Sequence, residues 1–229
     1  MIRFDAVSHA YGPRTVLRDL NLELVEHRVG VVGANGSGKS TLARMVNGLV
    51  VPTSGTVTVD GLDTARDGAA LRRKVAFVFS DPDAQIVMPT VAEDVAFSLR
   101  RQHLGRDVVA QRVAQVLERF GLGGYGDHPA HLLSSGQKQL LALAAVLVTE
   151  PELLVCDEPT TLLDLRNSRR VAALIASLPQ RVVLVTHDLD LLEGWDRVLV
   201  VNDGHVVADG PAEQTLPFYR RLMADGDPT

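Results

Sequence analysis

The spacing of hydrophobic and polar residues changes character twice along the chain. In the first third, apolar and polar residues alternate, or short runs rich in β-branched residues lie between turns, and both patterns are typical of strands. We therefore expect strands at residues 2–7, 20–24, 28–33, 55–61 and 75–79. Residues 39–49 have helical spacing and come directly after a glycine-rich turn.

The middle of the chain has helical spacing instead. Thr90 and Glu93 form a capping box, which predicts a helix from residue 91 to about 102. Apolar residues between 109 and 120 mark one face of a second helix, which ends at a glycine-rich run, 121–126. A third helix, 136–148, is apolar nearly all round, a pattern that is typical of a buried helix.

Strands and helices alternate in the last third. Apolar runs at 153–157 and 181–186 predict strands, and a helix is expected between them from about 164 to 177. Residues 198–202 and 205–209 predict a hairpin around Asp203-Gly204, followed by a polar C-terminal helix. The whole pattern predicts one α/β domain, residues 1–229. Its core comprises 1–84 and 150–229, and a helical subdomain, about 85–149, is inserted into it.

The composition excludes several classes of protein. The chain has 229 residues, 46% hydrophobic and 22% charged, so it is not disordered, collagenous or a coiled coil. Its net charge of −5 does not suggest a nucleic-acid binder. The single cysteine, Cys156, cannot form an internal disulfide, which favours a reducing compartment. The longest apolar run has nine residues, whereas a membrane-spanning helix needs about 20, so we expect no span. The N-terminus lacks the basic-then-apolar pattern of a signal peptide, so we expect none.

Residues 33–40, GANGSGKS, match the phosphate-binding pattern GxxxxGK[ST]. Glycines let backbone N–H groups converge on phosphates, and the helix that follows adds its positive N-terminus. Lys39 would reach the β- and γ-phosphates, and the Ser40 hydroxyl would bind Mg²⁺. The alternative, a glycine-rich turn that binds nothing, does not account for the position between a strand and a helix. The predicted nucleotide contacts are Gly33, Ala34, Asn35, Gly36, Ser37, Gly38, Lys39, Ser40 and Thr41.

Residues 153–158, LLVCDE, are an apolar strand that ends in two acids. Many buried strands end in an acid, so this motif indicates a function only in combination with the phosphate loop. Together they supply what phosphoryl transfer requires. Asp157 would hold Mg²⁺ through water, and Glu158 would orient and deprotonate the attacking water.

The motif Leu133–Gln137 reads LSSGQ. Ser134 and Gln137 form a second capping box, so a helix begins here with free N–H groups that suit an anion. The sequence resembles the ATP-binding cassette (ABC) ATPases, whose signature is LSGGQ; here Ser135 replaces the first glycine. The resemblance covers essentially the whole chain. It implies ATP hydrolysis by a P-loop NTPase (RecA-like) core with an N-terminal antiparallel β-subdomain and an inserted α-helical subdomain.

Other elements of the family occur in the expected order. Tyr11 matches the aromatic residue that stacks on adenine. Residues 161–164 match the family's loop that follows the strand ending in Asp157 and Glu158. His187 matches the switch histidine that senses the γ-phosphate. The resemblance also implies a head-to-tail pair, in which the signature of one subunit closes over ATP on the other. The signature residues are Ser134, Ser135, Gly136 and Gln137.

One position departs from the family pattern. The family usually has glutamine after the strand 75–79, where it contacts Mg²⁺ and the attacking water, and this chain has Ser80. We expect Ser80 to take the catalytic and metal-binding role, either directly or through an additional water. Gln85, five residues later, is the other candidate to compensate.

Two stretches of the sequence resemble one subgroup of the ABC family in particular. PDAQ at 82–85 followed by PTVAEDVAF at 89–97 resembles the energy-coupling factor and cobalt/nickel importers, and residues 134–167 resemble their biotin-type ATPases. This implies ATP and Mg²⁺ as cofactors and a homodimer or heterodimer of ATPases. The implied partners are a transmembrane coupling subunit and a substrate-binding membrane subunit, with no nucleic acid. The implied location is peripheral, on the cytoplasmic face of the cell membrane.

The cargo is not encoded in this chain, because another subunit would bind it; biotin is favoured and cobalt or nickel comes next. Two alternatives stay open. One is an ABC ATPase of translation or DNA repair with no membrane partner. The other is a regulatory subunit that binds ATP and turns it over slowly, which the serine at position 80 permits.

Overall fold

The computed structural model describes residues 1–224, and the strands in this part of the chain form two sheets. The smaller sheet is antiparallel, with the order β2-β1-β4-β5. It comprises β1 (Ile2–Tyr11), β2 (Arg14–Leu24), β4 (Ser54–Val59) and β5 (Leu62–Asp63). This sheet is the N-terminal antiparallel β-subdomain that the resemblance implied.

The larger sheet has six strands in the order β10-β9-β3-β8-β7-β6. It comprises β3 (Arg28–Gly33), β6 (Val75–Val78), β7 (Leu153–Asp157), β8 (Arg181–Val185), β9 (Arg197–Asn202) and β10 (His205–Gly210). All neighbours are parallel except β9 and β10, which form the predicted hairpin. The carboxyl ends of β3, β7 and β8 therefore meet at one edge, where ligands bind in sheets of this kind.

The first hairpin is longer than the sequence pattern predicts. β1 and β2 have 10 and 11 residues and turn at Gly12-Pro13, so the predicted ends at residues 7 and 20 are wrong. Pairing of the two strands is irregular between Phe4 and Ala10, and Ala6 has a φ of 45°. Bulges of this kind break the alternation of apolar and polar residues, which hides the rest of each strand from pattern analysis.

Seven helices occur within residues 1–224: α1 (Lys39–Val46), α2 (Gly68–Lys74), α3 (Val91–Leu99), α4 (Arg106–Arg119), α5 (Ser135–Leu147), α6 (Leu165–Ala176) and α7 (Ala212–Ala224). Both capping boxes are confirmed at the starts of α3 and α5. The predicted ends of α1 and α3, at residues 49 and 102, are too late. The sequence missed α2, whose single buried residue, Leu71, gives no periodicity to recognise. None of the helices within 1–224 is both long and apolar enough to cross a membrane.

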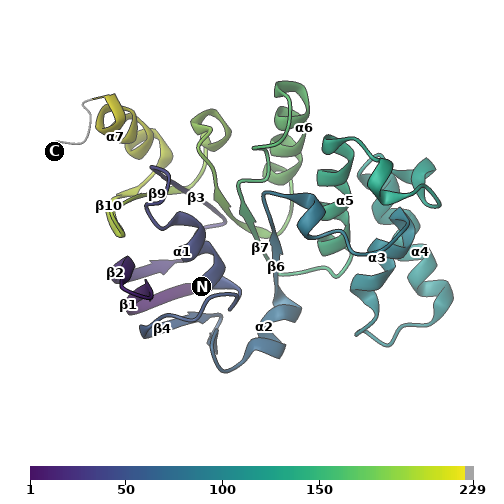
Figure 1. Ribbon diagram of the computed structural model, residues 1–229, viewed down its shortest axis with the longest axis horizontal. Helices are drawn as coiled ribbons and strands as arrows, with labels where there is room; N and C mark the ends of the chain where they lie inside the picture. The colour runs from purple at the N-terminus through teal and green to yellow at the C-terminus, as the bar shows by residue number, and fades with distance from the viewer. Residues whose placement is uncertain (225–229) are drawn as a thin grey trace.

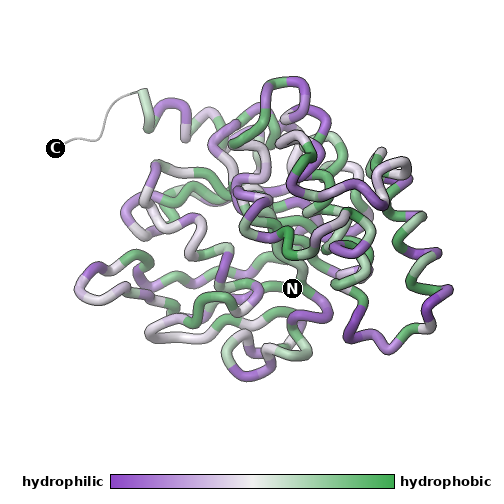
Figure 2. Tube along the Cα trace, turned by 45° about the vertical axis from the view of Figure 1, so that its right-hand side comes forward, coloured by the Kyte–Doolittle hydropathy of each residue, from purple (hydrophilic) through white to green (hydrophobic). Residues whose placement is uncertain are grey.

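Alternate residues of the larger sheet face two different hydrophobic clusters. Val32, Leu154 and Leu184 point into a cluster that includes the buried faces of α3, α4, α5 and α7. Val31 and Val155 point to the other side, against α1 and the smaller sheet. Figure 1 shows α3, α4 and α5 together at one end of the molecule and β1, β2 and β4 at the other, and Figure 2 shows hydrophobic and hydrophilic stretches alternating along the trace. The division of the chain into a core and a helical subdomain at residues 85 and 149 stays a prediction.

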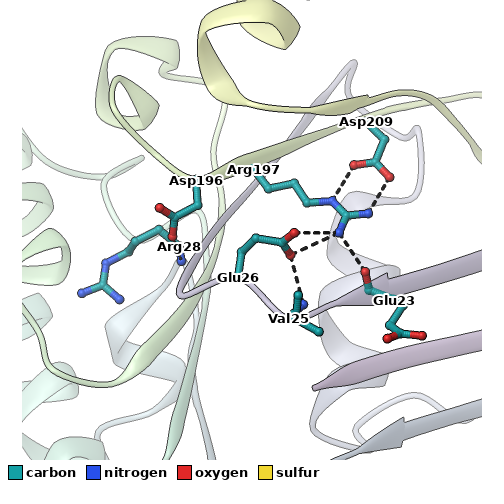
Figure 3. Close-up of polar contacts among 7 residues, drawn as sticks. All are labelled: Glu23, Val25, Glu26, Arg28, Asp196, Arg197 and Asp209. Carbon is teal, nitrogen blue, oxygen red and sulfur yellow. Dashed lines mark hydrogen bonds and ion pairs between the residues drawn. The ribbon is translucent and has the colours of Figure 1, made fainter.

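An ionic cluster around Arg197 joins the two sheets (Figure 3). The guanidinium of Arg197, on β9, donates two hydrogen bonds to the carboxylate of Asp209, at 2.6 and 2.7 Å. It also donates to the carbonyl of Glu23 at 2.8 Å and to both carboxylate oxygens of Glu26 at 3.1 Å. The hydrogen bonds with Asp209 raise the pKa of Arg197, although burial opposes this. The cluster therefore links β9 and β10 to the end of β2.

We expect Arg197→Ala to lower the free energy of unfolding by about 2–4 kcal/mol, because two half-buried carboxylates lose their partner. Urea unfolding followed by circular dichroism measures this loss. The matched control is Arg3→Ala, since Arg3 pairs with Asp5 while both side chains are half exposed. A surface pair of this kind contributes about 0–1 kcal/mol. Equal losses in the two variants would contradict the importance of the Arg197 cluster.

Candidate functional site

The phosphate loop lies between β3 and α1, as predicted, and wraps around the side chain of Lys39. The Lys39 ammonium donates hydrogen bonds to the carbonyls of Gly33 and Ala34, each at 2.8 Å. Burial lowers the pKa of Lys39, and the nearby carboxylates of Glu158 and Asp157 oppose that change. The loop thus holds a buried cation at its centre, where phosphate oxygens would complete its coordination.

A cavity of about 400 Å³ opens above this loop. Of the predicted nucleotide contacts, Tyr11, Asn35, Gly36, Gly38, Lys39, Ser40 and Thr41 line it, together with Glu158. Gly33, Ala34 and Ser37 do not line it. Arg14 and Val16 also line the cavity, and the sequence analysis missed both because it did not extend β2 back to the turn after Tyr11.

The Tyr11 ring stands at the rim of the cavity. It is half exposed and packs edge to face against the ring of His9, with centroids 4.6 Å apart. An exposed aromatic face beside a phosphate loop can stack on a base. The predicted adenine contact thus has the exposure that its role requires.

Two features of the loop fit a polyphosphate. Gly36 and Gly38 have φ values of 78° and 109°, which residues with a side chain rarely adopt. The buried Lys39 ammonium has three N–H donors, and the carbonyls of Gly33 and Ala34 accept only two of them. Within the described chain, the third N–H is free to donate to a phosphate oxygen, in the charge-assisted hydrogen bond that phosphate binding uses. The residues present therefore fit the triphosphate group of ATP.

The two predicted Mg²⁺ ligands of the loop and β7 lie in contact. The Ser40 hydroxyl donates to a carboxylate oxygen of Asp157 at 2.8 Å. The other carboxylate oxygen of Asp157 accepts from Arg44, one turn further along α1, at 3.2 Å. Hydroxyl and carboxylate oxygens suit Mg²⁺, which usually keeps several waters and binds one or two carboxylates. Ser40 and Asp157 would hold the ion here.

The two predicted hydrolytic residues also meet. Nδ1 of His187 lies 2.6 Å from a carboxylate oxygen of Glu158, and the Thr161 hydroxyl donates to the same oxygen at 3.1 Å. Glu158 has a φ of 54°, in the left-handed region. Its N–H donates to the carbonyl of Val185 on β8 at 2.9 Å. Its side chain faces the phosphate cavity, as a base that activates water must.

Gln85 is already committed to a structural role. Its amide oxygen accepts from the N–H of Phe79 at 3.2 Å, and its amide nitrogen donates to the carbonyl of Ala142 on α5 at 3.1 Å. Asp83 in the same segment pairs with Lys138 of α5 at 2.7 Å. Gln85 therefore ties the segment after β6 to the helix of the LSSGQ motif. Ser80, in this segment, does not line the cavity within the described residues, and its catalytic role stays a prediction.

We expect Ser80→Gln to preserve or raise the rate of ATP hydrolysis, because glutamine would restore the longer side chain that the family uses. Phosphate release at saturating MgATP measures this rate. Ser177→Gln, at the exposed end of α6, is the control for the added side chain. A loss of more than about tenfold in Ser80→Gln alone would show that the site is built around serine.

The signature residues lie away from the phosphate loop of their own chain. Ser134, Ser135, Gly136 and Gln137 form the N-terminal cap and first turn of α5. Gly136 packs against the side chain of Asn167 on α6, so closely that a Cβ would lie 2.8 Å from it. Within the residues described, none of the four lines the phosphate cavity. This placement favours their use by a second chain.

The fold and these contacts define the class of protein: an ATPase with a P-loop core. Residues 17–161 match the family model described as ABC transporter. A Deinococcus radiodurans protein, provisionally named an ABC transporter ATP-binding protein, is 57% identical over 97% of this chain and 99% of its own. The biotin transport ATP-binding protein BioM of Rhizobium etli is 44% identical over 97% of this chain and 99% of its own length.

A solved structure, cbiO1 of Clostridium perfringens, described as part of the ABC transporter complex cbiONQ, has a TM-score of 0.84 and 32% identity. It covers 97% of this chain, and 93% of that chain is matched. The chain belongs to the ABC transporter family, as an ATP-binding subunit with the ATPase activity of that family. The resemblance and the fold class expected from the sequence are confirmed.

Proposed function

We propose that this chain is the ATP-hydrolysing subunit of an energy-coupling-factor-type importer that takes up a micronutrient, with biotin favoured and cobalt or nickel next. The observation that carries the ATPase half of the proposal is the pairing of Ser40 with Asp157 and of Glu158 with His187 around one phosphate loop. The near full-length similarity to BioM supports the choice of biotin.

The residues divide the chemistry between them. Lys39 and the N–H groups of the loop bind the phosphates, and Tyr11 orients the base. Ser40 and Asp157 would hold Mg²⁺, which would supply positive charge to offset the charge of the phosphates. Glu158 accepts a proton from the attacking water, while His187 holds the carboxylate of Glu158 in place.

We further propose that two subunits close head to tail, so that the LSSGQ motif of one covers the nucleotide of the other. The signature lies outside its own cavity, as described above. Leu162, in the loop before α6, and Leu165, the first residue of α6, are 56% and 65% exposed. Apolar side chains this exposed beside the active site suit a face that is covered in a dimer. Contacts made to the γ-phosphate favour the closed pair, and hydrolysis removes them.

We also propose that the transmembrane coupling subunit docks at a second cavity. It measures about 350 Å³ and lies between the core and the helical region, with Phe77 of β6 on one side and Phe97 of α3 on the other. Arg72, Arg100 and Arg101 also line it. A lining that combines two aromatic rings with three arginines suits a helix of a partner, which would hold the ATPase at the cytoplasmic face of the membrane.

Co-purification of the tagged chain from gently solubilised native membranes, with mass spectrometry of the partners, tests the proposal. We expect a multi-span coupling protein and a small substrate-binding membrane protein, and the ligand of the latter identifies the cargo. Recovery of ribosomes or repair factors without a membrane partner would instead favour an ABC ATPase of translation or repair. Membrane partners together with very slow hydrolysis would favour a regulatory subunit.

A further inference from the structure

The turn between β9 and β10 is joined to the phosphate loop by backbone hydrogen bonds. The N–H of Gly204 donates to the carbonyl of Ser37, in the middle of the loop, at 3.1 Å. The carbonyl of Gly204 accepts from the N–H of Arg18 on β2 at 2.9 Å. One residue of the turn thus bridges the loop to the smaller sheet, although neither Asp203 nor Gly204 lines the phosphate cavity.

Close packing reinforces this bridge. A Cβ on Gly204 would lie 2.6 Å from the carbonyl oxygen of Val16, and a Cβ on Gly38 would lie 2.8 Å from the same oxygen. A Cβ on Gly33 would lie 2.0 Å from the carbonyl oxygen of Val201 on β9. Two glycines of the phosphate loop are therefore needed for contact with the backbones of β2 and β9. On the side away from the cavity, the loop thus packs against β2 and β9, and β9 is distant from it in sequence.

The turn has the geometry of a tight two-residue hairpin. Asp203 and Gly204 have φ values of 46° and 78°, both in the left-handed region, as two-residue turns of type I′ require. A phosphate loop binds only when its N–H groups already converge, because ordering them during binding would cost affinity. The Ser37 carbonyl, which the turn holds, belongs to the peptide unit that links Ser37 to Gly38.

We propose that the Asp203-Gly204 turn positions the phosphate loop for nucleotide binding, with Gly204 as the positioning residue. This inference rests on the proposed function, since it assumes that the loop binds ATP and ADP. Loosening the bridge removes no nucleotide-contacting side chain, but it lets the loop depart from its binding geometry. Affinity for the α- and β-phosphates then falls.

The chain provides a matched control in its second Asp-Gly turn. Asp60 and Gly61, between β4 and β5, have φ values of 49° and 80°, close to those of Asp203 and Gly204. A Cβ on Gly61 meets nothing within 4 Å, whereas one on Gly204 meets the Val16 carbonyl. The variants Gly61→Ala and Gly204→Ala therefore carry the same backbone strain, and only the second disturbs the bridge.

Calorimetric titration of the full chain with MgADP compares the two variants, at a temperature where circular dichroism shows both to be folded. We expect Gly61→Ala to bind within about twofold of the wild type and Gly204→Ala to bind about tenfold more weakly. Equal affinities for the two variants would overturn the proposal. Failure of the wild type to bind MgADP would overturn the proposed function instead.

Hydrogen exchange of the wild type tests the same point if Gly204→Ala does not fold. We expect MgADP to slow exchange at the amides of Gly204 and Arg18, which the nucleotide cavity does not include, because a fixed loop fixes the bridge. Protection of residues 33–46 with no change at the two bridge amides would overturn the proposal.

Discussion

Replacing Lys39 by alanine is expected to weaken MgATP binding by about 100-fold or more, because charge-assisted hydrogen bonds to phosphate are lost at the centre of the loop. The ammonium is buried and bonded only to the carbonyls of Gly33 and Ala34 in the described chain. It is therefore already aimed at the place where phosphates bind. Equilibrium titration with MgATP measures the effect.

Lys74→Ala is the matched control for this variant. Lys74 lies at the end of α2, is 41% exposed and pairs with Glu152 at 3.1 Å. Removing it also removes one positive charge, but far from the phosphate loop, so binding is expected to stay within about twofold. An unchanged affinity in Lys39→Ala, or equal losses in the two variants, would refute the assignment of the phosphate loop.

The parts of the site that are local in sequence were predictable. The phosphate loop and the two acids at the end of β7 are each part of a continuous motif with a clear apolar strand. Parallel pairing then brings the ends of β3, β7 and β8 to one edge of the sheet. For this reason the contacts Ser40–Asp157 and Glu158–His187 follow from the motifs once the sheet is known.

The parts that depend on long-range contacts were not predictable from the pattern. Arg14 enters the cavity because a bulged hairpin places it beside Gly36, and the bulges hide that hairpin. Gln85 was a candidate for the hydrolytic site, yet its amide bridges Phe79 and Ala142, which are 63 positions apart. No local periodicity encodes which distant backbone group an amide will meet.

The glycines of the phosphate loop also have one role that the sequence predicts and one that depends on long-range contacts. The sequence motif assigns the glycines of the loop to phosphate binding, and the position of Gly36 in the cavity lining is consistent with this assignment. Gly33 and Gly38 are required also by the carbonyls of Val201 and Val16 behind the loop. That second requirement is visible only when β2, β9 and the loop are placed together.

Replacing Glu158 by glutamine is expected to lower the rate of ATP hydrolysis by about 10²–10⁴-fold while ATP affinity changes little, because an amide cannot accept the proton from water. Glutamine keeps the size of the side chain, and its amide can still meet His187 and Thr161. The triphosphate therefore persists, and the contacts that favour the closed pair persist with it. In MgATP, size-exclusion chromatography is expected to show this variant as a stable dimer.

Glu152→Gln is the control, since Glu152 is an exposed acid just before β7 that pairs with Lys74. Its hydrolysis is expected to match the wild type, and MgATP is expected to produce no lasting dimer. Wild-type hydrolysis in Glu158→Gln would remove Glu158 from its catalytic role. Loss of hydrolysis without a trapped dimer would keep Glu158 as the base but contradict closure by γ-phosphate contacts, because the intact triphosphate would then fail to hold the two subunits together.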